Sequence, residues 1–158
     1  MSYVRFAAMI AVSTVVMFGL MYLNTYTSDH VYYSQTRAWM AVMMGAVMAL
    51  IMLGFMLKMY TNRKANIAIA VTSVAIAIAS ISMVRSQATV DDVSWMKAMI
   101  PHHSIAILTS RRAQIRDPRV RRLADGIIEA QLREISEMKQ LTQELERRPR
   151  APELPPGK

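Results

Sequence analysis

Three long apolar runs constrain this chain more than any other feature of its sequence. They cover residues 6–23, 38–57 and 67–84, and none contains an acidic, basic or histidine side chain. In a helix, about 20 residues rising ~1.5 Å each cross the hydrocarbon core of a bilayer. We therefore predict three transmembrane helices, the first an uncleaved anchor because no small-residue cleavage site follows it. The lack of charges within them argues against a proton-coupled transporter.

The charges of the connecting loops predict the orientation of these helices. The second connection carries Lys58, Arg63 and Lys64 without an acid, whereas the first has Arg37 against Asp29. Short basic loops stay in the cytoplasm. We expect the N-terminus to be cytoplasmic and everything after residue 84 to face the periplasm of a bacterial inner membrane.

The second apolar run contains a stripe of methionines. Met44, Met48 and Met52 share one side of the expected helix. Such a stripe can act as a conduit for Cu(I), but methionine also fills irregular helix interfaces, and Gly45 and Gly54 indicate close packing here. The chain has 15 methionines and no cysteine, which excludes disulfides and thiolate metal sites.

The soluble part opens on the motif Trp95–His103, reading WMKAMIPHH. Helical spacing of about 100° per residue places four side chains within roughly 60°, namely Asp92, Met96, Met99 and His103. His102 lies beside them, and Pro101 should kink the helix there. Thioether sulfur with imidazole nitrogen suits Cu(I). The same methionines can instead be core residues, and the histidines can lie at a polar boundary.

A second soluble helix completes a hairpin. We expect the first helix to end near Ile115, and the second to begin at Asp117-Pro118 and end near Arg147. Six apolar side chains are its expected packing positions: Leu123, Ile127, Leu132, Ile135, Leu141 and Leu145. Three further residues share one face, Gln131, Glu134 and Met138. Met138 is a further candidate sulfur ligand, while Asp92, Gln131 and Glu134 can orient a histidine without touching the metal.

The region from Val90 to Leu145 resembles the domain-of-unknown-function 305 family, ferritin-like helical modules of bacterial envelope proteins, some of which bind copper. The resemblance rests on WMKAMIPHH, on Ala106, and on IIEAQ at 127–131 with Glu134, Ile135 and Met138. It implies copper ligands at Met96, Met99, His102, His103 and Met138. Family members often carry two such hairpins in a four-helix bundle. This chain carries one, so a second copy is the simplest source of the missing helices.

The remaining charge and polar features are less specific. The net charge is +8, with arginines clustered at the interhelix turn, at positions 111, 112, 116, 119, 121 and 122. A solvated turn or contact with anionic lipid headgroups explains them, and nucleic acid is an unsuitable partner outside the cytoplasm. His30, in the first loop, is either solvated or an auxiliary ligand. No Glu-x-x-His spacing or nucleophile with a base is recognisable, so we do not expect an enzyme.

The sequence thus predicts an all-α protein with three parts. These are a transmembrane region at 1–84, an extracytoplasmic His/Met hairpin at 85–148 and a disordered, proline-rich tail at 149–158. The predicted function is copper binding, with Cu(I) favoured, in homeostasis or resistance, by a membrane-anchored homo-oligomer. The alternatives are a membrane interaction module without metal, and a metal conduit along the methionine stripe.

Overall fold

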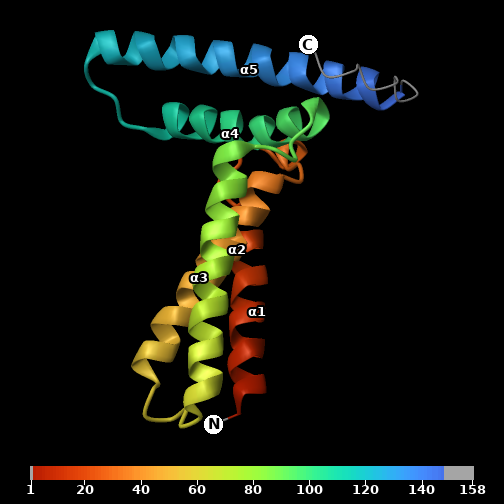
Figure 1. Cartoon of the computed structure of the whole chain (residues 1–158). Coiled ribbons are helices and arrows are strands. Elements are labelled where there is room, and N and C mark those ends of the chain that lie inside the picture. Colours follow the sequence, from red (N-terminus) through yellow and green to blue (C-terminus); the bar gives the residue numbers. More distant parts are fainter. Residues whose placement is uncertain (1, 148–158) are drawn as a thin grey trace. The chain divides into compact units, whose positions relative to one another are not determined.

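The computed structural model describes residues 2–147, and the predicted tail lies outside this range. Within it the chain is all-α, without strands (Figure 1). The elements are α1 (Tyr3–Leu20), the short 3-10 helix η1 (Ser28–His30), α2 (Gln35–Phe55), α3 (Arg63–Ser86), α4 (Asp92–Arg112) and α5 (Pro118–Arg147). The all-helical prediction is confirmed.

Helices α1, α2 and α3 are each long and apolar enough to cross a membrane. α1 ends at Leu20, three residues before the predicted end of its apolar run, because the next residues serve the start of α2. The hydroxyl of Tyr22 accepts a hydrogen bond from the amide of Ser34 at 3.1 Å, and the guanidinium of Arg37 donates to the carbonyl of Met21 at 2.9 Å. The chain is therefore tied across the turn that follows α1.

Small residues let these helices approach one another. α2 packs against both α1 and α3, whereas no Cα atom of α1 lies within 8 Å of one in α3. α2 buries a stripe formed by Ala41, Gly45, Ala46, Ala49 and Leu53. A Cβ atom at Gly45 would collide with the hydroxyl of Thr14, so the expected close packing at Gly45 is confirmed. At Gly54 the expectation is wrong, since no atom lies within 4 Å of a Cβ built there.

The chain divides into two compact units. The first contains residues 1–23 and 34–90, which include α1, α2 and α3. The second contains the described residues from 91 to 147 together with the loop 24–33, which the sequence interpretation counts with the membrane region. We call residues 24–33 the strap, because they pack against the α4–α5 hairpin although 57 residues separate them from it in sequence.

Local signals set the ends of the hairpin helices. The carboxylate of Asp91 accepts a hydrogen bond from the amide of Ser94 at 2.7 Å and so caps α4. Asp117 accepts from the amide of Arg119 at 2.8 Å, which confirms the predicted cap of α5. α4 ends at Arg112, before the predicted Ile115, and Pro101 lies inside it.

Candidate metal centre

Methionines gather in the core between α4 and α5. Met96 and Met138 are buried there together with Ile100, Ile107 and Ile135, and the half-buried Met99 packs against this cluster. Each of the three methionines was a predicted ligand. The hairpin therefore brings three thioethers from two helices into one apolar cluster.

His103 lies at the edge of this core, and both of its ring nitrogens are engaged. Nδ1 is 3.0 Å from the carbonyl oxygen of Met99, and Nε2 is 2.9 Å from a carboxylate oxygen of Glu134. Gln131 Nε2 is 3.5 Å from the same Glu134 oxygen. Glu134 and Gln131 thus stand where a pair that orients a histidine would stand. Both nitrogens therefore face acceptors, and a metal at Nε2 would have to displace Glu134.

The other predicted site residues lie further from this cluster. His102 is exposed, and its ring centroid is 6.2 Å from that of His103. Asp92 is also exposed and lines a cavity of about 360 Å³ together with Trp95, Met96, Leu141, Glu144 and Leu145. The structure does not bring His102 into the methionine core.

The donor set of the core is restricted to soft atoms. Among residues 2–147, no group of three or more histidine, cysteine, aspartate or glutamate side chains could hold a metal ion. A metal in the hairpin core would therefore depend on thioethers. One of these already has a polar neighbour, since the hydroxyl of Thr142 lies 3.8 Å from the sulfur of Met96. Thioethers with one imidazole fit Cu(I) and do not fit a hard cation.

The methionine stripe of α2 differs from this core. Met44, Met48 and Met52 are half-buried at the side of the small-residue stripe. Met52 packs against a second cluster that contains Phe6 and Tyr60.

The strap holds a polar cluster that sequence reasoning missed. Ser104, fully buried on α4, accepts a hydrogen bond from the amide of Tyr26 at 2.7 Å. Its Oγ is also 3.0 Å from Nδ1 of His30, which is buried. A hydroxyl has two lone pairs and one proton, so Ser104 can bond to Tyr26 and to His30 at the same time. His30 therefore packs against α4 as a structural residue of the strap.

Charges fix the strap at a second point. Lys139 on α5 donates to the carboxylate of Asp29 at 2.6 Å, and this hydrogen bond is the main cause that lowers the pKa of Asp29 to about 2. Burial is the main cause that lowers the pKa of His30 below 6.5, and the charge of Lys139 adds to it, while Asp29 opposes it. Burial therefore favours the neutral ring of His30.

The strap covers one side of the hairpin and leaves the other side open. Lys139 of α5 bonds to the strap, and Ile128 lies within about 20° of it, so both are roughly 140–160° from Leu123 and Leu141 by helical spacing. We define the open face by Asp92, Trp95, Met99 and His103 of α4 and by Leu123, Ile127, Glu134, Leu141 and Leu145 of α5. Trp95 is 50% exposed and Leu123 is 65% exposed. Of the six predicted packing positions of α5, only Ile135 is buried, because α5 has a single helix to pack against.

Fold and site together define an all-α protein with three apolar helices of membrane-spanning length and a helical hairpin with a methionine-rich core. The chain belongs to the family described as domain of unknown function DUF305, whose model matches residues 92–154. It is similar to an uncharacterized protein of Acanthamoeba polyphaga mimivirus, 38% identical over 104 residues, which cover 61% of this chain and 68% of that protein. This similarity is longer than the family match. No solved structure matches the chain.

Proposed function

We propose that this protein is a membrane-anchored Cu(I)-binding protein that acts in copper homeostasis or resistance. Met96, Met99 and Met138 are the proposed sulfur ligands, and His103 is the proposed nitrogen ligand. The observation that carries the proposal is the packing of these three methionines into one cluster, with His103 hydrogen-bonded at its edge. His102 is left outside the proposed ligand set, because it is exposed.

The chemistry of the donors supports a monovalent soft ion. Thioethers need no deprotonation before they bind a metal, so the methionines are competent at any pH. His103 must first lose the carboxylate of Glu134 from Nε2, so Glu134 competes with the metal for this nitrogen. Copper, when bound, would link α4 to α5 through side chains of both helices.

The cellular placement of the site is part of the proposal. The basic α2–α3 connection supports a cytoplasmic location for that loop and a periplasmic location for the hairpin, in a bacterial inner membrane. The chain would then present its methionines to an oxidising compartment, in which thioethers cannot form disulfides.

A second candidate function is assembly without metal, and the open face favours it. An exposed tryptophan and exposed leucines lie together on this face, where Leu141 and Leu145 line a cavity with Trp95. A second copy packed on the open face would complete a four-helix bundle and cover His103. The two candidates are compatible, since a dimer would place two methionine cores near one symmetry axis.

An anaerobic Cu(I) titration against a competing chelator tests the metal site. The samples are the purified full-length parent, the Met96→Leu/Met138→Leu variant and a matched control, Met48→Leu/Met52→Leu. Leucine nearly conserves the volume of methionine, so the fold should persist. We expect at least ~10-fold weaker binding for the hairpin variant, in the range seen when groups that tune a metal site are lost, and unchanged binding for the control.

Two further results separate the alternatives. An equal loss of Cu(I) binding in the Met96→Leu/Met138→Leu and Met48→Leu/Met52→Leu variants would support the conduit. Weak Cu(I) binding by the parent would leave assembly as the function. Glu134→Gln provides an independent check on His103, because a neutral amide holds Nε2 less strongly than a carboxylate does. We expect this variant to bind Cu(I) more tightly, and tighter binding should disappear in Glu134→Gln/His103→Ala.

A further inference from the structure

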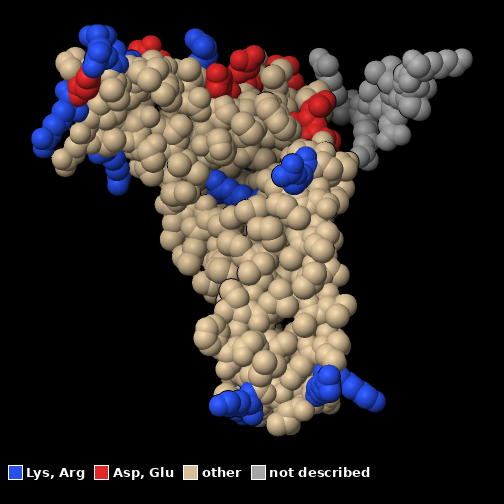
Figure 2. Space-filling model, turned by 60° about the vertical axis from the view of Figure 1, so that its left-hand side comes forward, with Lys and Arg blue, Asp and Glu red and all other residues tan. Residues whose placement is uncertain are grey.

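One end of the three-helix unit is positively charged. Tyr3, at the start of α1, reaches the α2–α3 connection, where its hydroxyl donates to Asn66 Oδ1 at 2.8 Å and its ring lies 4.9 Å from that of Tyr60. The start of α1 and this connection therefore share one end of the unit. That end carries four exposed basic residues, Arg5, Lys58, Arg63 and Lys64. Figure 2 shows Lys and Arg side chains gathered at this end, with no acidic side chain among them on the face in view.

These cations have no counter-charge within their unit. Residues 1–23 and 34–90 contain six basic residues and no aspartate or glutamate. One of the six, Arg37, is satisfied internally, since it donates to the carbonyl of Met21 and its guanidinium lies 4.5 Å from the ring centroid of Tyr22. The basic end must therefore be neutralised from outside the unit.

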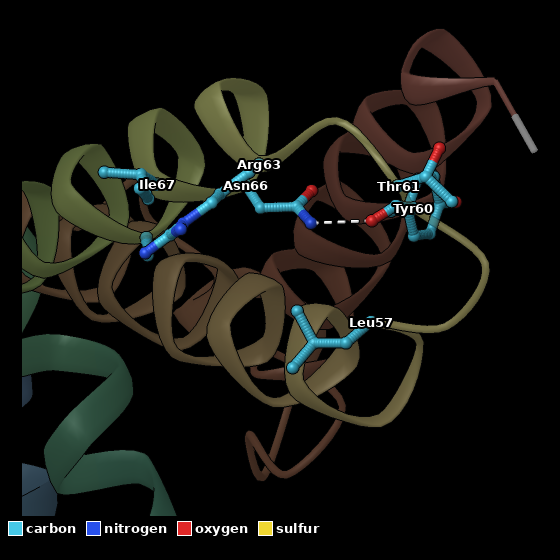
Figure 3. Close-up of a pocket in the computed structure, with 7 residues that line it drawn as sticks. Leu57, Tyr60, Thr61, Arg63, Asn66 and Ile67 are labelled. Atoms are coloured by element: carbon cyan, nitrogen blue, oxygen red, sulfur yellow. Dashed lines mark hydrogen bonds between the residues drawn. The ribbon is translucent and has the colours of Figure 1, made fainter.

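A cavity of about 530 Å³ opens beside these charges. Its polar wall is made by Thr61, Arg63 and Asn66, and its apolar wall by Leu57, Tyr60, Ile67 and Ala70 (Figure 3). Asn66 is fixed in place, because its amide donates to the carbonyl of Tyr60 at 2.7 Å. Tyr60 itself is 1% exposed and packs on Phe6, with ring centroids 5.4 Å apart. Asn66 is thus held in place within the polar wall.

An apolar groove begins at the same end. The backbones of α1 and α3 stay apart, with no Cα pair within 8 Å, and a cavity of about 520 Å³ lies between them and α2. Alanines form much of its surface, and its lining includes Tyr3, Ala7, Ala11, Ala49, Ala68 and Ile69. Tyr3 connects this groove to the polar wall through its hydrogen bond to Asn66. A charged head and an apolar chain can therefore be held by adjoining surfaces.

We propose that this end of the three-helix unit is a binding site for an anionic phospholipid. Its phosphate is recognised by Arg63 and Lys64 with support from Lys58, and one acyl chain lies in the groove between α1 and α3. Charge complementarity selects this occupant. The four cations have no acidic partner within their unit, and they lie at the level of the lipid headgroups once the apolar helices span a bilayer. The site does not depend on copper.

Native mass spectrometry of the delipidated full-length protein in detergent tests this site. Phosphatidylglycerol and phosphatidylcholine with identical acyl chains are titrated into the parent, an Arg63→Gln/Lys64→Gln variant and an Arg85→Gln control. Arg85 is an exposed cation in the last turn of the same helix. Each basic residue near a lipid surface changes binding by ~5-fold, so we expect ~25-fold weaker phosphatidylglycerol binding for the double variant and little change for the control.

The acyl chain and the phosphate are tested separately. Ala68→Phe places a large side chain in the groove and should weaken phosphatidylglycerol binding, whereas Ala79→Phe, exposed further along α3, should not. Equal binding of the two lipids by the parent would overturn the proposal, and this arm needs no variant. The proposal would also be overturned if inorganic phosphate competed for the site as strongly as phosphatidylglycerol does, since the site would then bind a free anion.

Discussion

Substitution of Ser104 by alanine should release the strap from the hairpin while the hairpin stays folded. The hydroxyl of Ser104 has two partners in the strap, the amide of Tyr26 at 2.7 Å and Nδ1 of His30 at 3.0 Å. Alanine leaves both groups without this partner, and an unsatisfied buried polar group costs ~1–3 kcal/mol. Tyr26 is half-buried, so water recovers part of its loss, and we expect about 2 kcal/mol in total. That is ~30-fold in the equilibrium for strap opening.

Hydrogen exchange followed by mass spectrometry measures this opening in the full-length protein. Protection of the peptide that contains residues 24–33 should fall ~30-fold in Ser104→Ala, while protection within α4 and α5 is retained. Thr109→Ala is the matched control, because the Thr109 hydroxyl donates to carbonyls of its own helix at 3.0 and 3.2 Å. Unchanged exchange of the strap in Ser104→Ala would refute the reasoning, and so would an equal loss of protection throughout the hairpin.

Three further predictions follow from the described contacts. Because the pKa of His30 is lowered in the bound strap, His30 of the released strap takes up a proton at a higher pH, so binding of the strap should weaken as the pH falls below 6.5. His30→Gln should remove this pH dependence of hydrogen exchange. Gly45→Ala should destabilise the three-helix unit by ~1–3 kcal/mol in thermal unfolding, because its Cβ collides with Thr14, and Thr14→Ala should rescue it. Asp117→Ala should cost ~1 kcal/mol through loss of the α5 cap, seen as faster amide exchange in its first turn, whereas Asp125→Ala, which removes an exposed ion pair, should cost less.

Features that depend on neighbours in sequence were predictable. The three apolar helices follow from composition and length, and the Asp117 cap with Pro118 follows from local hydrogen bonding. The pairing of His103 with Glu134 was partly visible, because helical spacing placed both near the α4–α5 interface. The side chains at Leu123 and Leu141 were predicted to pack but are exposed, since periodicity identifies an apolar face without showing whether a neighbour covers it.

Features that depend on distant segments were not predictable. The ion pair of Asp29 with Lys139 joins residues 110 positions apart, and nothing in either local sequence indicates the partner. His30 was weighed as a solvated loop residue, yet it is buried against Ser104. The buried Ser104 on α4 gave no signal, because serine side chains are mostly exposed and the local sequence does not mark an exception.

The strap restricts how the chain can cross a membrane. Residues 24–33 and the hairpin belong to one compact unit, so they must lie in the same compartment. The segment between the strap and the hairpin contains α2 and α3. The chain returns to the same side of the membrane only if this segment crosses the membrane an even number of times. One crossing by either helix alone would separate Asp29 from Lys139 by a bilayer, although they form an ion pair at 2.6 Å. Since both helices are apolar enough to span, two crossings satisfy the strap and the hydrophobic surfaces together. The even number of crossings follows from the strap alone, independently of the loop charges and the positive-inside rule.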